Sequence, residues 1–435
     1  MRQHPWIRFG RNRFVLLAVL GLLLSWLIGC GSGQPSATTS QTDPGIQEVE
    51  FWTMQLQPDF TDYFNGLIAD YETQNPAVKV RWVDVPWADM QSKILTAVTA
   101  GTAPDVVNLN PDFAAQLASK NAWLLLDDKL SEADKQVYLP NIWQASTLNG
   151  QSFGLPWYLT TNVTLYNQTL LDQAGVKPPQ TYADLAAVAK QVKEKTGKYA
   201  YFTTFVPEDS ADVLQSFVQM GVDLVDDQGN AAFDTPAGQA VFQYWTDLYQ
   251  QELLPREVLT QGHRRAIELF QAQEVALLST GAEFFPTIEA NAPDVAKVTR
   301  SAAQITGDTG KQNVAVMNLV IPSATDVPDA ALDFALYVTN DANQLSFAKA
   351  ANVLPSTVAA LEDAYFVASD GAKQGVDLAR SVSAGQMSQA EVLIPAMDGI
   401  TELQAMIYDN LQAAMLGQKP VEQAVADAAA AWDGR

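Results

Sequence analysis

The sequence predicts an α/β protein of two lobes, and three observations support this fold class. The chain has 435 residues, and one hydrophobic core rarely serves more than roughly 250–300 residues. Hydrophobic residues make up 48% of the chain and charged residues 17%, which is the composition of a globular protein. Strand-like and helix-like segments alternate through residues 46–109, a pattern typical of parallel sheets flanked by helices.

Residues 1–29 have the features of a lipoprotein signal peptide and are left out of the fold prediction. Arginines at positions 2, 8, 11 and 13 precede an apolar run from Phe14 to Ile28. This run of about 15 residues is short for a membrane span, which needs roughly 20. Leu27-Ile28-Gly29-Cys30 matches a lipobox, so we expect cleavage after Gly29 and lipidation of Cys30. The alternatives are an uncleaved anchor or an ordinary signal peptide.

Residues 30–46 are predicted to be a flexible tether, because residues 31–42 are rich in Gly, Ser and Thr. A lipid at Cys30 would hold the folded body at the extracytoplasmic face of a membrane, near a membrane partner. Cys30 is also the only cysteine of the chain, so a disulfide within the chain is excluded.

The first part of the mature chain predicts a parallel sheet. Residues 46–52, 78–83 and 105–109 have the pattern of strands. Between them, residues 60–74 and 89–100 have the apolar spacing of helices. In open parallel sheets, ligands bind beyond the carboxyl ends of the strands. The loops that follow these three strands are therefore the places to look for a site.

Those loops combine aromatic rings with short hydrogen-bonding side chains. A sugar requires this pairing, since its C–H faces stack on rings and its hydroxyls need donors and acceptors. For each aromatic the alternative is core packing, and for Asp112 it is capping of a helix that begins near Phe113. The candidate ligand-binding residues from these loops are Trp52, Met54, Gln55, Trp87, Asn110 and Asp112.

The middle of the chain continues the α/β pattern. Residues 153–161 form an aromatic segment that leads into a strand at residues 163–167. Thr181 is placed to cap a helix over residues 182–194.

At these segments the chain resembles the sugar-binding proteins of bacterial ATP-driven importers, the family that contains the maltose- and trehalose-binding proteins. The similarity runs from about residue 47 to the end of the chain. The matching segments, in order, are residues 101–107, 124–128, 153–158, 165–167, 174–181, 270–277, 320–322, 330–335 and 352–356.

The resemblance implies a two-lobed periplasmic-binding-protein fold with a hinge and a central ligand cleft. It places residues 47–158 and about 315–365 in the first lobe, and residues 159–314 and about 366–435 in the second. It also implies a monomer that captures a carbohydrate and delivers it to a membrane permease.

Further site residues follow from the resemblance, position by position. Trp157, with Tyr158 beside it, matches an aromatic after the first crossing. Thr160 stands where the family often has an acid, which puts maltose- or trehalose-type specificity in doubt. In the second lobe, Glu208, Glu283 and Phe284 are expected to face the cleft, and Asn318, near the strand that crosses back, is a further candidate. The alternative for Glu283 is a solvated charge at a helix end.

The charge pattern restricts the ligand. The formal net charge of −23 argues against binding nucleic acid, which depends on Lys and Arg contacts to phosphate. The candidate cleft loops contain no Lys or Arg, which favours a neutral sugar over an anion. A polyol phosphate and a polyamine remain the alternative ligands.

The sequence offers little for catalysis. His263 is the only histidine after the signal peptide, and its polar neighbours predict an exposed loop. No cofactor or metal site is indicated. The chain lacks the Gly-rich phosphate loop of an ATPase, so the ATPase of an importer would be a separate subunit. A sugar sensor or adhesin on the same fold is the other alternative.

Overall fold

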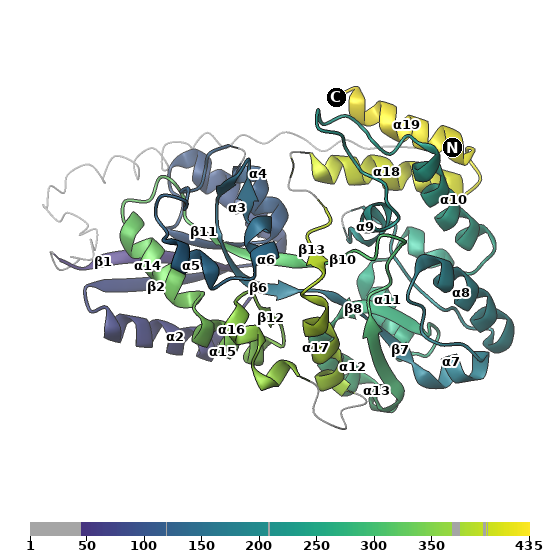
Figure 1. Cartoon of the computed structure of the whole chain (residues 1–435), viewed down its shortest axis with the longest axis horizontal. Coiled ribbons are helices and arrows are strands. Elements are labelled where there is room, and N and C mark those ends of the chain that lie inside the picture. Colours follow the sequence, from purple (N-terminus) through teal and green to yellow (C-terminus); the bar gives the residue numbers. More distant parts are fainter. Residues whose placement is uncertain (1–44, 119, 208, 368–374, 395–396, 398) are drawn as a thin grey trace, which may run out of the picture. The chain divides into compact units, whose positions relative to one another are not determined.

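A computed structural model describes residues 45–118, 120–207, 209–367, 375–394, 397 and 399–435. At positions 111, 112, 115 and 116 it describes the backbone alone. Residues 46–435 form one compact unit (Figure 1). The predicted signal peptide, Cys30 and nearly all of the tether lie outside the described residues. In the described part of the chain, no helix has the length and apolar character needed to cross a membrane.

The larger sheet has six strands in the order β12-β6-β11-β3-β1-β2. β1 is parallel to both β2 and β3, as the sequence predicted. The sheet as a whole is mixed, because β11 runs antiparallel to β3 and β6. The strands are β1 (Gln47–Met54), β2 (Val78–Val85), β3 (Val106–Leu109), β6 (Leu155–Thr160), β11 (Ala315–Val320) and β12 (Leu354–Pro355).

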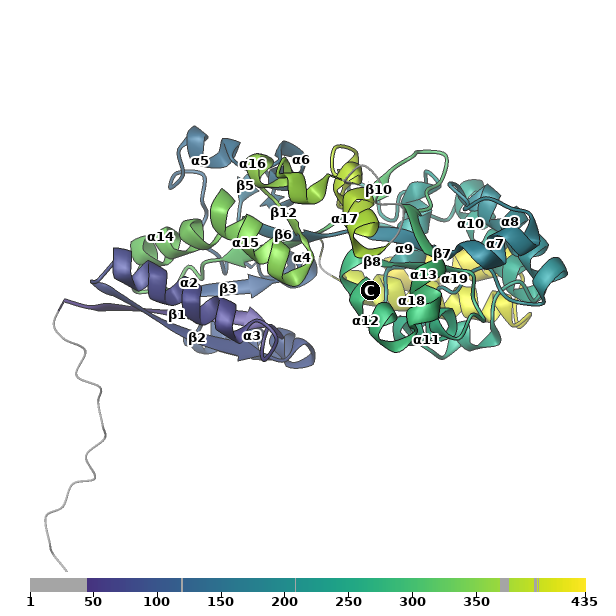
Figure 2. The same ribbon diagram turned by 90° about the horizontal axis from the view of Figure 1, so that it is seen from below.

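Helices cover both faces of this sheet (Figure 2). Successive side chains of a strand point to opposite faces, so Phe51 and Trp52 pack on opposite faces of the sheet. The Phe51 face packs on α2 (Thr61–Gln74), α14 (Pro328–Val338) and α15 (Asp341–Ala351). The Trp52 face packs on α3 (Trp87–Ala100) and α4 (Pro111–Ala118).

A second core surrounds the three-stranded antiparallel sheet β8-β7-β9. The strands are β7 (Asn162–Asn167), β8 (Leu277–Gly281) and β9 (Thr299–Ala303). Helix α8 (Tyr182–Thr196) begins with a capping box between Thr181 and Asp184, which confirms the predicted cap. The other helices are α7 (Gln168–Ala174), α9 (Asp212–Gln219), α10 (Pro236–Gln250), α11 (His263–Gln271), α12 (Phe285–Asn291), α13 (Pro293–Val298), α17 (Gly375–Gln386), α18 (Ile400–Met415) and α19 (Val421–Asp433).

The chain crosses between the two cores where β6 continues into β7 and where β9 leads to β11. Hydrogen bonds join these crossings, since the Thr161 hydroxyl donates to the Asn313 carbonyl at 2.6 Å. The segment that follows α17 adds a short parallel pair beside these crossings, β10 (Gln312–Asn313) with β13 (Ala390–Glu391). The two crossings and the β10–β13 pair together form one hydrogen-bonded strip.

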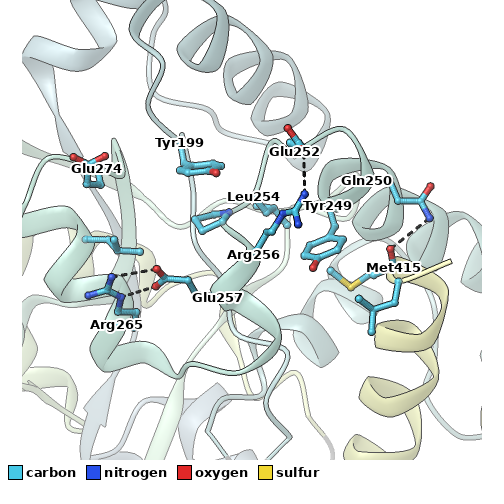
Figure 3. A pocket seen from close by; sticks show the side chains of 13 residues that line it. Tyr199, Tyr249, Gln250, Glu252, Leu254, Arg256, Glu257, Arg265, Glu274 and Met415 are labelled. Atoms are coloured by element: carbon cyan, nitrogen blue, oxygen red, sulfur yellow. Dashed lines mark hydrogen bonds and ion pairs between the residues drawn. The ribbon is translucent and has the colours of Figure 1, made fainter. Parts of the chain in front are cut away.

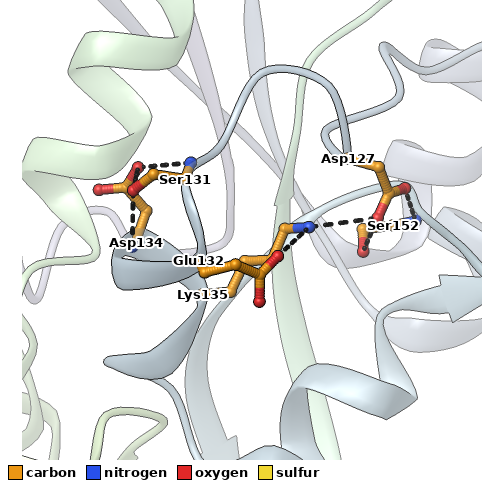
Figure 4. A network of polar contacts seen from close by, with 6 residues as sticks. All are labelled: Asp127, Ser131, Glu132, Asp134, Lys135 and Ser152. Carbon is orange, nitrogen blue, oxygen red and sulfur yellow. Dashed lines mark hydrogen bonds and ion pairs between the residues drawn. The ribbon is translucent and has the colours of Figure 1, made fainter.

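A polar network fixes the connection that precedes β6 (Figure 4). Ser131 and Asp134 form the capping box of α5 (Glu132–Gln136). The Asp127 carboxylate accepts the backbone N–H of Ser152 at 2.7 Å and lies 3.6 Å from the Lys135 ammonium. These contacts attach the 124–136 segment to β5 (Gln151–Ser152). The remaining short elements are α6 (Pro140–Ala145), β4 (Thr147–Leu148) and α16 (Val358–Leu361).

Candidate ligand cleft

Two neighbouring cavities are lined by residues of both cores. The outer cavity has a volume of about 1030 Å³ and the inner one about 260 Å³. Asp209, His263, Glu283 and Phe284 line both cavities, so the two are adjoining spaces. The outer volume matches a ligand pocket, for which roughly 300–1,000 Å³ is usual.

The first-lobe wall of the outer cavity lies beyond the carboxyl ends of β1 and β2. Met54 ends the β1 strand, Gln55 follows it, and Trp87 is the first residue of α3. The Gln55 side-chain carbonyl accepts the backbone N–H of Trp87 at 3.2 Å, which fixes the two loops together. The Trp87 side chain is 46% exposed. An exposed ring at this edge of the sheet is available for stacking on a ligand.

The second-lobe wall is built from one face of α11 and from residues 283–291, which include α12. Arg264, Ile267, Glu268 and Gln271 lie on the α11 face, at the three- and four-residue spacing that places side chains on one side of a helix. The side-chain nitrogen of Gln271 is buried and has no hydrogen-bond partner among the described residues. The lining residues of the second segment are Glu283, Phe284, Thr287 and Asn291.

His263 stands at the first turn of α11, at the boundary of the two cavities. The Asp209 carboxylate accepts its backbone N–H at 2.7 Å. A Cβ at Gly262 would lie only 2.0 Å from that carboxylate, so glycine permits the approach. The imidazole Nε2 lies 3.1 Å from the Thr280 hydroxyl. The N-terminal end of α11 is thereby already occupied by a carboxylate.

Burial changes the protonation of the acids in the cleft. Burial raises the pKa of Glu283 to about 7, because desolvation penalises the charged carboxylate. Burial also raises the pKa of Asp212, an effect that the nearby His263 opposes. Burial and the charge of Glu283 raise the pKa of Tyr158, so this phenol stays a hydrogen-bond donor. The cleft therefore offers donors and acceptors together.

Three predicted site residues are corrected by the structure, because their side chains lie in cores. Trp157 is fully buried and stacks on Phe347, with ring centroids 4.9 Å apart. Trp52 is 6% exposed, and its indole N–H donates to Glu50 at 2.6 Å. Asn318 is 1% exposed and accepts a hydrogen bond from the Ser146 hydroxyl at 2.5 Å.

Most of the other predicted residues line one or both of the paired cavities. Met54, Gln55, Trp87, Tyr158, Glu283 and Phe284 line the outer cavity, and Thr160, Glu283 and Phe284 line the inner one.

Asn110 has a structural partner instead. Its side-chain oxygen accepts the backbone N–H of Phe113 at 2.9 Å, which caps the start of α4. Glu208 and the side chain of Asp112 lie outside what the structure describes.

Sequence reasoning missed the α11 wall. The polar neighbours of His263 predict an exposed loop at residues 262–265, and the candidate cleft loops, which contain no Lys or Arg, do not include α11. The structure corrects both expectations, since His263 begins α11 and Arg264 lines the outer cavity. The signal was present in the spacing of His263, Ile267 and Gln271 at i, i+4 and i+8.

A third cavity, of about 700 Å³, lies wholly within the second lobe (Figure 3). Tyr199 and Tyr249 line it, and an ion pair between Arg265 and Glu257, at 2.5 Å, forms part of its wall. No first-lobe residue contributes to its lining. A ligand there could not bridge the two lobes, so the paired cavities are the candidate site.

The geometry of a cleft between two α/β lobes agrees with the comparisons. A sequence profile of the family described as bacterial extracellular solute-binding protein matches residues 57–345. The chain belongs to this family. Its members are solute-binding proteins that act outside the cytoplasm, and the structures similar to this chain are two-lobed. The predicted fold class is confirmed.

Individual relatives support this placement in the bacterial solute-binding family. A putative oligosaccharide periplasmic-binding protein from Synechococcus sp. MITs9220 is 45% identical, over 89% of this chain and 98% of that one, with a TM-score of 0.82. The arabinooligosaccharide-binding protein of Halalkalibacterium halodurans is 27% identical over 322 residues, 69% of each chain. The cyclic alpha-maltosyl-1,6-maltose binding protein from Arthrobacter globiformis, 20% identical with a TM-score of 0.76, shares the fold over 90% of this chain and 99% of that one.

The Synechococcus protein was also solved in complex with zinc. In the described part of the present chain, no group of three His, Cys, Asp or Glu side chains is placed to hold a metal ion.

Proposed function

We propose that this protein is the lipid-anchored binding subunit of an ATP-driven carbohydrate importer. It captures a sugar in the paired cavities and delivers it to a membrane permease that works with a separate ATPase. In this proposal residues 1–29 are a signal peptide, Cys30 carries the lipid, and the mature protein acts as a monomer without catalysing a reaction.

The observation that carries the proposal is the pairing of exposed rings across the cleft. Trp87 on the first lobe and Phe284 on the second are 46% and 37% exposed, and both line the outer cavity. Carboxyl and amide side chains and the Tyr158 phenol line the same cavity as these two rings. Aromatic faces with convergent polar groups suit a sugar, whose rings are apolar on their faces and polar at their rims.

A ligand that touches both lobes stabilises the arrangement in which the lobes are close, through its preferential affinity for that state. We propose residues 47–158 with about 315–365 as one moving lobe, and residues 159–314 with about 366–435 as the other. Transport would then depend on recognition of the closed form by the permease.

The electrostatics of the cleft support a sugar over an anion. Asp209 already occupies the N-terminus of α11, the position where a phosphate would otherwise bind. Asp212, Glu268 and Glu283 add further carboxylates, against Arg264 and His263. A polyamine is the second candidate ligand, because these acids would attract a cation.

A thermal-shift screen of the full chain, purified in detergent, tests the proposal. The panel is maltotriose, arabinotriose, glucose, arabinose, glycerol 3-phosphate and spermidine. A ligand present at 100 times its dissociation constant adds about 2.7 kcal/mol of stability. A shift with a neutral sugar is the expected result. A shift with spermidine alone would transfer the assignment to polyamines, and a shift with glycerol 3-phosphate alone would contradict the electrostatic argument.

A further inference from the structure

We infer that His263 positions the bound sugar, through a hydrogen bond from its imidazole Nδ1 edge to a ligand hydroxyl at the junction of the two cavities. The inference rests on the proposed function and deepens it. It assigns a specificity-determining role to a residue that the sequence had indicated only as part of an exposed loop.

The first argument is position. Among the described residues, four line both the outer and the inner cavity: His263, Asp209, Glu283 and Phe284. A ligand that extends from one cavity into the other must pass this ring. The inner cavity, at about 260 Å³, is smaller than a usual drug-sized pocket, so it suits one end of a longer ligand.

The second argument is that the ring is held in place before any ligand binds. Its backbone N–H donates to Asp209 at 2.7 Å, and its Nε2 lies 3.1 Å from the Thr280 hydroxyl. Thr280 is 1% exposed, on strand β8. The imidazole also lies edge-on to Phe284, with centroids 5.7 Å apart and an interplanar angle of 70°. A pre-organised side chain loses little freedom on binding.

The third argument is that one edge of the ring stays unused. Nε2 contacts the Thr280 hydroxyl. Nδ1 has no hydrogen-bond partner among the described residues, and it is not one of their fully buried, unpartnered atoms. If Nε2 donates, Nδ1 accepts, and the reverse holds for the other tautomer. A sugar hydroxyl serves either case, because it both donates and accepts.

The charged side chains that the structure describes around the ring do not supply that partner. Asp209 is used by the α11 backbone, and Asp212 accepts from the Asn162 amide at 3.3 Å. Glu283 folds back over Gly281, where a Cβ would lie 2.1 Å from its carboxylate oxygens. Arg264 and Glu268 follow His263 on α11 and line the outer cavity only.

Two substitutions separate ligand contact from support of the fold. His263→Asn keeps a hydrogen-bonding atom near the Nδ1 position and gives up the contact to Thr280. His263→Gln keeps a polar atom near the Nε2 position and gives up the Nδ1 edge. Both variants and the wild-type full chain are titrated calorimetrically with maltotriose and with arabinotriose, and unfolding midpoints are recorded for each. The exposed Gln418→Ala, far along the chain in the α18–α19 turn, serves as the control.

The expected result is that His263→Gln binds the trisaccharide roughly tenfold more weakly, the loss typical of one hydrogen bond. His263→Asn should stay within about threefold of the wild type. Unchanged binding by His263→Gln, or equal losses in both variants, would overturn the inference while wild-type binding keeps the proposed function. Failure of the wild type to bind either trisaccharide would overturn the inference, and the absence of a thermal shift with any sugar of the panel would overturn the proposed function as well.

Discussion

The side-chain amide of Gln304 donates a hydrogen bond of 3.0 Å to the hydroxyl of Thr161. This contact joins the segment between β9 and β11 to the turn between β6 and β7, which are two of the connections between the lobes. The Gln304 oxygen also accepts the backbone N–H of Asn313 at 2.8 Å, and its own backbone N–H donates to Gln386 at 2.9 Å. One buried glutamine therefore joins both of these connections to the C-terminal end of α17.

Replacing this residue should destabilise the protein. Gln304→Leu leaves the backbone N–H of Asn313 without its partner, and an unsatisfied buried group costs about 1–3 kcal/mol. Urea unfolding should show that decrease. Gln418→Leu, at an exposed position, should change stability by less than about 0.5 kcal/mol. If the two variants lose the same free energy of unfolding, the hydrogen bonds of Gln304 do not stabilise the connections between the lobes.

Trp157 is expected to act in folding, not in binding. Trp157→Ala should lower the free energy of unfolding by about 3–5 kcal/mol, since the ring is fully buried against Phe347 and Phe51. Its indole nitrogen has no hydrogen-bond partner among the described residues, so Trp157→Phe loses packing alone. Titration of the folded Trp157→Phe variant should give the wild-type affinity. If the folded Trp157→Phe variant binds the sugar ten times more weakly, Trp157 contributes to the ligand site.

Glu283 should make stability depend on pH. Its pKa rises from 4.5 in the unfolded chain to about 7 in the folded one. Between these values the folded state keeps a proton that the unfolded state has lost, so stability falls as pH rises through this window. Below pH 4.5 the carboxyl is protonated in both states, and above pH 7 the loss is complete.

Glu283→Gln removes this titration and isolates its effect. The variant should match the wild type near pH 4 and exceed its stability by about 1–3 kcal/mol at pH 8. Chemical unfolding across this range measures the difference, in which acids common to both proteins, such as Asp212, cancel. A stability difference that stays constant with pH would show that the pKa of Glu283 is the same in the folded and the unfolded chain.

Trp87 and Phe284 should contribute jointly to binding. Trp87→Ala and Phe284→Ala should each weaken sugar binding by about 1–2 kcal/mol, through the loss of stacking and apolar contact. If both rings contact one ligand, a double-mutant cycle should give a coupling of about 0.5 kcal/mol or more. Calorimetric titration measures the binding free energy of each single variant and of the double variant. Leu95→Ala, which removes an equally exposed apolar side chain from the same helix, should leave affinity unchanged.

Much of the local structure could be predicted. The alternation of β1, α2, β2, α3 and β3 was read from apolar periodicity, and the Thr181 cap from the polar residue that precedes a helical pattern. These features depend on residues within a few positions of one another, and so the sequence contains them directly. Loops at the carboxyl ends of strands were also predicted, and Gln55 and Trp87 lie there beside the cavity.

The candidate site was only partly predictable. Trp157 and Trp87 are the same residue type and each directly follows a proline, yet one is fully buried and the other is 46% exposed. The difference comes from Phe347, about 190 residues further along the chain, which covers Trp157. The α11 wall was missed because its polar residues gain a role only through contact with cavities formed by distant segments.

By itself, the sequence determined the α/β class, the first three parallel strands and the helix caps, since each follows from the period of the apolar residues and from short-range backbone bonding. Only the tertiary structure decided that β11 enters the sheet antiparallel, that Trp157 belongs to the core, and that His263 stands between two cavities. Those outcomes depend on which distant segments meet, because burial and hydrogen-bond partners are properties of the packed chain and not of any one segment.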